Sequence, residues 1–245
     1  MKRIAKQIGP AALCLAAIFL LTACEKDSGV GGVAGDAGEA AIAANQTMAQ
    51  KLDFNRDQDF QEALRGLIAK PQGRILAADG TVLVDLGAFH FVAGEAPPTV
   101  NPSLWRHAKL NAGIGLFKVT DGIYQLRGFD LGNMTLIEGK TGWIVVDPLT
   151  CRESAAFAFA FAQKHLGEKP VSAMIITHSH VDHFGGALGI VSPREAASRR
   201  LPVIAPQGFL EEAISENLMV GTAMARRSSY QFGKDLERSA KGMVD

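Results

Sequence analysis

The chain has 245 residues, of which 47% are hydrophobic and 20% are charged, a composition typical of globular proteins. Its length suffices for one large domain or two small ones. Its formal net charge is zero, so composition gives no support for a nucleic-acid partner.

The first residues have the pattern of an export signal. Residues 2–6 carry three basic side chains and no acidic one, and the apolar run 11–21 is too short for a stable membrane span. This run leads into Leu-Thr-Ala-Cys, which resembles a bacterial lipobox, where cleavage precedes the cysteine and the cysteine is lipidated. We therefore expect a signal peptide at 1–23 and a lipid anchor on Cys24, which would make this an exported, periplasmic, membrane-attached protein. An ordinary signal with another cleavage position is the alternative.

The next stretch has the composition of a tether. Residues 25–50 are rich in glycine and alanine and contain no aromatic side chain, so we expect 24–50 to be the lipidated cysteine and a flexible linker. Apart from the cysteines at 14 and 24, only Cys151 is present, so no intramolecular disulfide framework is expected.

Residues 51–115 give mixed signals, and we expect an N-terminal helix followed by a wrapping segment. Apolar residues spaced by four and three predict an amphipathic helix over 57–70, which Pro71 ends. Residues 81–84 predict a strand, and Trp105 is expected to anchor the wrapping segment by packing.

From residue 116 onward the pattern is that of an α/β domain. Turn residues separate four short apolar stretches that predict strands at 116–119, 123–126, 134–138 and 143–146. Thr150 and Glu153 fit a capping box for a helix of about 15 residues that Gly167 stops. A buried strand is predicted over 171–176. The order strand, helix, strand indicates a parallel pair of strands.

Further strands and helices follow that pair. Residues 201–205 predict a strand, 208–218 a helix, and the remainder is polar with a helical tendency.

The most informative stretch is 177–186, which we call the motif loop. It holds His178, His180, Asp182 and His183 just past the end of the buried strand, where a core element fixes the position of a loop. Imidazole and carboxylate groups together suit Zn²⁺ or a similar divalent ion. The four side chains could serve one ion or be shared by two. A polar surface loop without function is the alternative.

Two neighbouring residues could support this loop without binding metal. Asp147 follows the strand at 143–146, at the end from which a carboxylate could contact the loop. Thr177 opens the loop itself. The alternative for Asp147 is an ordinary turn residue at the end of a strand.

The pattern His-x-His-x-Asp-His after a strand resembles the signature of the metallo-β-lactamase superfamily. Four flanking segments, 122–130, 133–139, 142–149 and 216–227, resemble the branch of alkyl sulfatases that hydrolyse linear primary alkyl sulfate esters. The likeness extends over roughly 80–245. It implies an α/β fold, the αββα sandwich of metallo-β-lactamases, for a domain at 116–245.

The resemblance also implies a chemistry. His178 and His180 would hold one zinc ion, and Asp182 and His183 a second. Activated water would attack the carbon of a primary alkyl sulfate, and sulfate would leave. Arg226 and Arg227 could receive a sulfate or form a solvated face.

No histidine follows His183 in the sequence. The resemblance implies further acidic ligands and another histidine downstream, then a helical dimerisation domain and a lipid-carrier-like domain. We therefore expect the chain to be the N-terminal part of a longer enzyme, homodimeric when complete. The sandwich would then be incomplete, and this polypeptide alone would bind metal weakly and turn over poorly.

Three alternatives remain open from the sequence. The first is another hydrolase of the same superfamily, acting on a thioester, lactam or phosphoester. The second is a membrane-tethered metal-binding protein without turnover. The third is a fragment that does not fold stably, because site formation and folding are coupled in metal-dependent domains.

Overall fold

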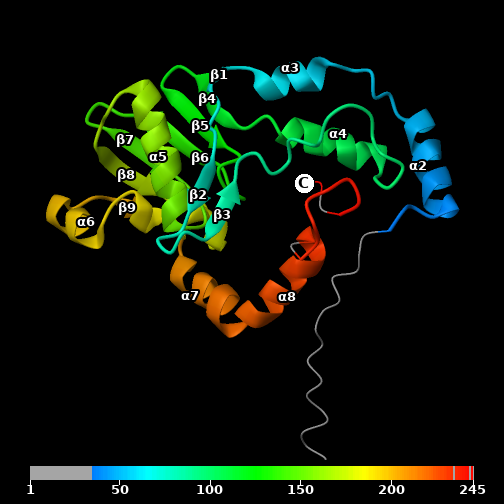
Figure 1. Cartoon of the computed structure of the whole chain (residues 1–245). Coiled ribbons are helices and arrows are strands. Elements are labelled where there is room, and N and C mark those ends of the chain that lie inside the picture. Colours follow the sequence, from blue (N-terminus) through cyan, green and yellow to red (C-terminus); the bar gives the residue numbers. More distant parts are fainter. Residues whose placement is uncertain (1–34, 234, 243, 245) are drawn as a thin grey trace, which may run out of the picture. The chain divides into compact units, whose positions relative to one another are not determined.

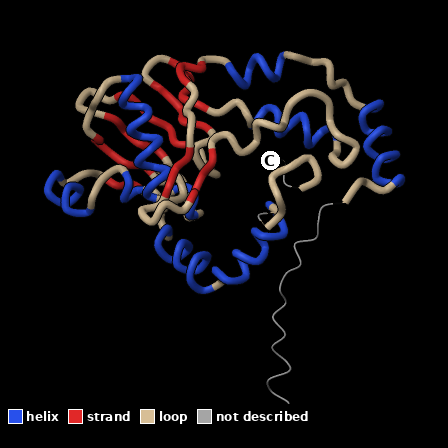
Figure 2. Tube along the Cα trace, viewed as in Figure 1, coloured by secondary structure: helices blue, strands red, loops and turns tan. Residues whose placement is uncertain are grey.

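The computed structural model describes residues 35–233, 235–242 and 244. Within them the chain forms a seven-stranded sheet, a two-stranded hairpin and several helices (Figure 1). Among the described residues all the strands fall between Leu67 and Ile204, and the described parts on either side of this stretch are helix and loop (Figure 2). The predicted α/β class is confirmed.

The predicted signal peptide and lipidation site lie outside the described residues. Among the residues that the structure describes, no helix has both the length and the apolar content needed to cross a membrane.

The large sheet joins an antiparallel meander to a parallel edge. Its order is β1-β4-β5-β6-β7-β8-β9, with antiparallel pairing up to β7 and parallel pairing of β7 with β8 and of β8 with β9. The strands are β1 (Leu67–Ala69), β4 (Gly115–Thr120), β5 (Ile123–Arg127), β6 (Met134–Glu138), β7 (Trp143–Val146), β8 (Val171–Ile175) and β9 (Val203–Ile204). The predicted meander and parallel pair are confirmed. Because parallel strands end at the same edge of a sheet, the segments after β7 and β8 emerge next to each other.

Helix α5 (Arg152–Leu166) forms the core with one face of the sheet. Residues alternate along the strands, so that Leu136 and Val145 are fully buried while the residues next to them are half-buried. The face that α5 presents to this core includes the fully buried alanines Ala155, Ala158 and Ala162. The predicted helix and its end at Gly167 are confirmed.

The start of α5 differs from the predicted capping box. Cys151, not Thr150, is the N-cap, and its Sγ accepts the N–H of Ser154 at 3.5 Å. Thr150 instead donates its hydroxyl to Oδ1 of Asp130 at 2.6 Å and its N–H to Oδ2 at 3.1 Å. The Ser154 hydroxyl donates to the same carboxylate. A charged acceptor forms stronger hydrogen bonds than a neutral one, which explains why Thr150 turns toward Asp130.

The predicted flexible linker is wrong for its second half. Helix α2 (Glu39–Lys51) occupies it, and Nδ2 of Asn45 donates to the carbonyl oxygen of Pro98 at 2.8 Å. The glycines of this stretch end at Gly38, and the run that follows is rich in alanine, the residue with the highest helix propensity.

The helix predicted over 57–70 is also shorter than expected. Helix α3 spans Gln58–Leu64, and the residues after it form β1 against β4. Gly66 has φ +75°, a left-handed conformation that ends the helix, and a Cβ there would lie 2.1 Å from the carbonyl oxygen of Lys118. The apolar stripe therefore divides between a helix and a strand.

The remaining elements surround this core. They are β2 (Arg74–Leu76) and β3 (Val82–Asp85), which form the hairpin, and the helices α4 (Pro102–Asn111), α6 (Pro193–Arg199), α7 (Phe209–Ile214) and α8 (Gly221–Phe232). A π-helical segment, Ser215–Met219, joins α7 to α8, so the helix predicted over 208–218 changes its hydrogen-bonding pattern midway. Trp105 of α4 is buried in a second cluster with Val92, Val100 and Val244, which agrees with its predicted packing role.

Candidate metal centre

The motif loop and Asp147 meet at the edge of the sheet where β7 and β8 end. Asp147 follows β7, and its N–H donates to the carbonyl oxygen of Ile175, the last residue of β8, at 3.0 Å. Its φ is +53°, which is uncommon for a residue other than glycine. In this conformation the Asp147 carboxylate makes three contacts with the motif loop.

The Asp147 carboxylate is buried and organises two of the histidines. Oδ1 accepts the N–H of Thr177 at 2.8 Å, and Oδ2 accepts the Thr177 hydroxyl at 2.7 Å. Oδ2 also lies 2.9 Å from Nδ1 of His183. The Thr177 hydroxyl in turn lies 2.9 Å from Nδ1 of His178. One carboxylate therefore contacts His183 directly and His178 through a hydroxyl.

These contacts assign the protons on the two rings. A carboxylate is only an acceptor, so Nδ1 of His183 carries the proton. The Thr177 hydroxyl donates its single hydrogen to Asp147, so it must accept a hydrogen bond from Nδ1 of His178. In each neutral ring Nε2 is then an unprotonated nitrogen, the form in which imidazole binds metal.

The donor groups of the motif loop lie close together. Ring centroids are 4.0 Å apart for His178 and His183 and 4.6 Å apart for His178 and His180. Nε2 of His183 lies 3.2 Å from Oδ2 of Asp182. Two ligands bound to one zinc ion at about 2.0–2.2 Å in tetrahedral geometry are roughly 3.3–3.6 Å apart, so the separation of this pair is close to that of two ligands sharing an ion.

The structure does not show a complete ligand set. Across the described residues, no three His, Cys, Asp or Glu side chains converge on a common point as ligands of one ion would. Imidazole and carboxylate groups are suitable zinc ligands, and here they lie close together in pairs. The assignment of the four residues as ligands therefore stays a prediction.

Two glycines hold the motif loop against the segment that follows β7. The N–H of Gly186 donates to the carbonyl oxygen of Leu149 at 2.9 Å. A Cβ on Gly185 would lie 2.1 Å from the carbonyl oxygen of Thr150, and one on Gly186 would lie 2.1 Å from that of Pro148. Only a residue without a side chain fits so close to backbone atoms.

Replacing Gly186 with alanine is expected to lower the free energy of unfolding by about 1–3 kcal/mol, the usual cost of overpacking. Gly186 has φ −83°, so the cost is steric and not conformational. Urea denaturation followed by circular dichroism measures it. Gly35→Ala is the control, because nothing lies within 4 Å of that position, and its change should stay within about 0.5 kcal/mol. Equal midpoints for the two variants would show that the loop is not packed as described.

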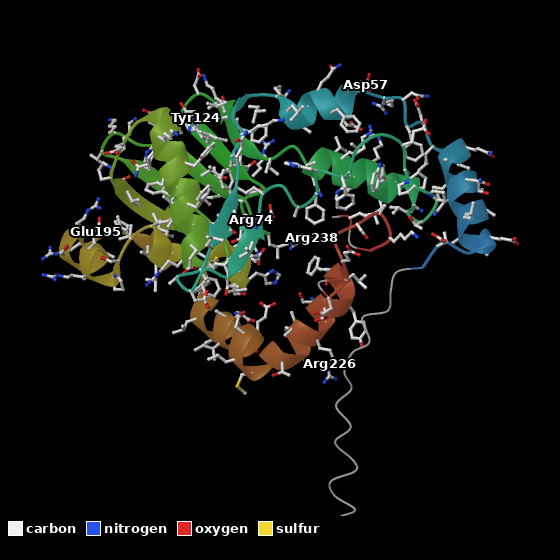
Figure 3. All side chains as sticks on the ribbon, viewed as in Figure 1. Asp57, Arg74, Tyr124, Glu195, Arg226 and Arg238 are labelled. Carbon is white, nitrogen blue, oxygen red and sulfur yellow. The ribbon has the colours of Figure 1, made fainter. Side chains whose placement is uncertain are left out.

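The arginine pair that could receive a sulfate or form a solvated face lies on a helix after the motif loop. Both residues, Arg226 and Arg227, are exposed on α8, and Figure 3 labels Arg226 there. The two interpretations, an anion contact and a solvated face, both stay predictions.

Sequence reasoning missed two contacts of the centre. One is the link from His178 through Thr177 to Asp147, which depends on side-chain geometry. The other is Glu216, whose Oε1 lies 3.4 Å from Nε2 of His180. Glu216 comes from the π-helical segment, and no spacing pattern connects it to the motif loop.

Comparison with known proteins defines the class of this domain. Residues 127–238 match the family model of the metallo-beta-lactamase superfamily. This segment, which includes the whole motif loop, is a metallo-beta-lactamase domain.

Its homologues are alkylsulfatases. The chain is 45% identical over 208 residues to an alkyl/aryl-sulfatase of Saccharomyces cerevisiae, covering 84% of this chain and 32% of that protein. It is 46% identical over 209 residues to a linear primary-alkylsulfatase of a Pseudomonas species, covering 84% of this chain and 31% of that protein. The solved structure of the stereoselective inverting sec-alkylsulfatase Pisa1 from Pseudomonas superposes with a TM-score of 0.83 at 44% identity, covering 86% of this chain and 34% of that one.

The resemblance to the alkylsulfatase branch is thereby confirmed. The chain spans about a third of the length of these relatives.

Proposed function

We propose that this domain supplies the zinc-binding histidines of an enzyme that hydrolyses linear primary alkyl sulfate esters to alcohol and sulfate. The observation that carries the proposal is the gathering of three imidazoles and Asp182 at the sheet edge, with the buried carboxylate of Asp147 fixing the tautomer of two rings. The similarity to proteins named as alkylsulfatases supports the reaction class.

In this proposal His178 and His180 hold one zinc ion, and Asp182 and His183 hold a second. Zinc, when bound, acts as a Lewis acid and lowers the pKa of water toward neutrality. Asp147 keeps a proton on Nδ1 of His183, and Thr177 keeps one on Nδ1 of His178, so that both Nε2 atoms stay available. The rigid sheet edge holds these side chains in place before any ligand binds.

Release of inorganic sulfate tests the reaction. The zinc-loaded chain, in molar excess over substrate so that a slow reaction is scored, is incubated with 1-octyl sulfate and in parallel with 2-octyl sulfate. We expect sulfate from 1-octyl sulfate, faster than from the secondary ester, and loss of the signal when a chelator removes zinc. The preference for primary over secondary esters depends on this comparison of the two substrates. Relatives named for primary and for secondary esters are similar to this chain to nearly the same degree.

A parallel panel of a thioester, a β-lactam and a phosphoester covers the other reactions of the superfamily. Hydrolysis of one of these in place of both sulfate esters would contradict the proposal. Equal sulfate release before and after chelation would contradict the role of zinc.

A further inference from the structure

Asp130 is the centre of a hydrogen-bond network beside the motif loop. It lies between β5 and β6, and its carboxylate accepts four hydrogen bonds, the full capacity of its two oxygens. Oδ1 accepts the N–H of Leu131 and the hydroxyl of Thr150, each at 2.6 Å. Oδ2 accepts the N–H of Thr150 at 3.1 Å and the Ser154 hydroxyl. One side chain therefore joins the loop between β5 and β6 to residues 147–150, which we call the β7–α5 turn, and to the start of α5.

The β7–α5 turn has an uncommon backbone conformation. Asp147 has φ +53° and Leu149 has φ +63°, although neither is glycine. A left-handed conformation is an exception for a bulky residue, and it persists only where the surrounding contacts impose it. The Leu149 side chain is fully buried, and its carbonyl oxygen accepts the N–H of Gly186 at 2.9 Å. The next N–H along the chain, that of Thr150, donates to Asp130, so this carboxylate is one of the contacts that impose the turn.

The β7–α5 turn has Asp147 at one end and Thr150 at the other. Asp147 accepts the N–H of Thr177 at 2.8 Å and lies 2.9 Å from Nδ1 of His183. Thr150, three residues later, is held by Asp130 through both its N–H and its hydroxyl. Because few rotatable bonds separate the two ends, a fixed Thr150 limits the directions in which the Asp147 carboxylate can point. Asp130 thereby acts on the motif loop through the turn.

The loop that carries Asp130 also packs directly on the motif loop. Gly132 is buried, and a Cβ at this position would lie 2.5 Å from the carbonyl oxygen of Asp182. The N–H of Leu131, between Asp130 and Gly132, is one of those that the Asp130 carboxylate accepts. Asp130 is therefore anchored against the motif loop, the same loop that the β7–α5 turn has to meet.

We propose that Asp130 is a positioning residue of the candidate metal centre, which holds the β7–α5 turn in its left-handed conformation and so keeps the Asp147 carboxylate on Thr177 and His183. The inference rests on the proposed zinc centre and adds to it a residue that is neither a proposed ligand nor a direct partner of one. A role only in the start of α5 would act through Ser154, which donates to the same carboxylate, and the experiment separates these two roles.

Amide hydrogen exchange in the metal-free chain measures the contact that Asp130 is proposed to hold. The N–H of Thr177 donates to Asp147, so its protection reports whether that carboxylate is in place. In Asp130→Asn an amide nitrogen, which cannot accept, replaces one oxygen. We expect Thr177 to exchange at least about tenfold faster relative to the amides of β6, which report unfolding of the sheet. The matched control is Ser154→Ala, which removes one donor to the same carboxylate and should change this ratio less than about twofold.

Zinc affinity supplies the second readout. Loss of a residue that orients a ligand weakens metal binding 10–100-fold, and Asp130 lies one step further out, so we expect about tenfold for Asp130→Asn and less than twofold for Ser154→Ala. Thr150→Val removes the hydroxyl donor and keeps the N–H, so we expect about a threefold change in both readouts, in the same direction. This variant decides the question if Asp130→Asn does not fold.

Two results would overturn the role of Asp130: Thr177 protection that stays at the wild-type level in the variants at Asp130 and Thr150, or equal effects of Asp130→Asn and Ser154→Ala on both readouts. Failure of the wild-type chain to bind zinc would overturn the zinc centre of the proposed function. The exchange of Thr177, measured without metal, would still decide whether Asp130 holds Asp147 in place.

Discussion

Replacing His178 and His180 together with alanine is expected to weaken zinc binding by at least about 100-fold. Loss of an orienting residue alone costs 10–100-fold in metal affinity, and loss of two ligands should cost more. The remaining pair, Asp182 and His183, keeps its 3.2 Å contact, so we expect residual binding of one ion at most. Equilibrium dialysis with metal analysis by mass spectrometry measures both affinity and stoichiometry.

The matched control for this variant is His90→Ala with His165→Ala, which removes two exposed histidines outside the motif loop. Their loss should leave zinc binding within twofold of wild type. If both double variants bind zinc equally, the motif loop is not the metal site.

Asp147→Asn is expected to weaken zinc binding 10–100-fold and to lower the free energy of unfolding by about 1–3 kcal/mol. Asparagine keeps the size of the side chain and tolerates the left-handed backbone at φ +53°. Its amide group, however, offers one acceptor atom where the carboxylate has two. With the amide nitrogen toward His183, Nδ1 of that ring has to accept a hydrogen bond, which moves the ring proton to Nε2 and blocks the nitrogen needed for zinc.

Zinc titration and urea denaturation of the same preparation separate the two effects. Asp121→Asn is the control, because the side chain of Asp121 is 97% exposed and its ion pair with Lys118 is a surface pair. It should leave zinc binding unchanged and lower the free energy of unfolding less than Asp147→Asn does, because exposed ion pairs contribute little to stability. A variant at Asp147 that lost stability but bound zinc like wild type would show that Asp147 supports the fold without orienting His183.

The parts of the fold that depend on local sequence were predictable. The strands β4 to β8 follow from short apolar runs between turn residues, and α5 follows from its alanine content and the glycine that stops it. The position of Asp147 next to the motif loop also follows, because parallel strands end at one edge.

The features that depend on distant partners were not predictable from patterns. Residues 67–69 continue a helical stripe in sequence, yet they pair with β4 because Gly66 reverses the backbone conformation. Thr150 lies three residues before Glu153, as an N-cap in a capping box would. Its hydroxyl instead donates to Asp130, and Cys151 is the N-cap. In both cases an interaction with a residue far along the chain outweighs a local preference.

The same distinction applies to the site. Four candidate ligands within six positions give a strong local signal, and the motif loop carries them all. Asp147, which contacts His183, comes from the segment after β7, so only the folded chain brings the two together.

The central claim is that the motif loop binds zinc through imidazole nitrogen, and zinc K-edge X-ray absorption of the zinc-loaded chain tests it most directly. We predict a shell of nitrogen and oxygen ligands at about 2.0–2.1 Å with the multiple scattering that imidazole rings produce, reduced in the His178→Ala, His180→Ala variant. A shell without imidazole scattering, or one that this variant leaves unchanged, would contradict the claim.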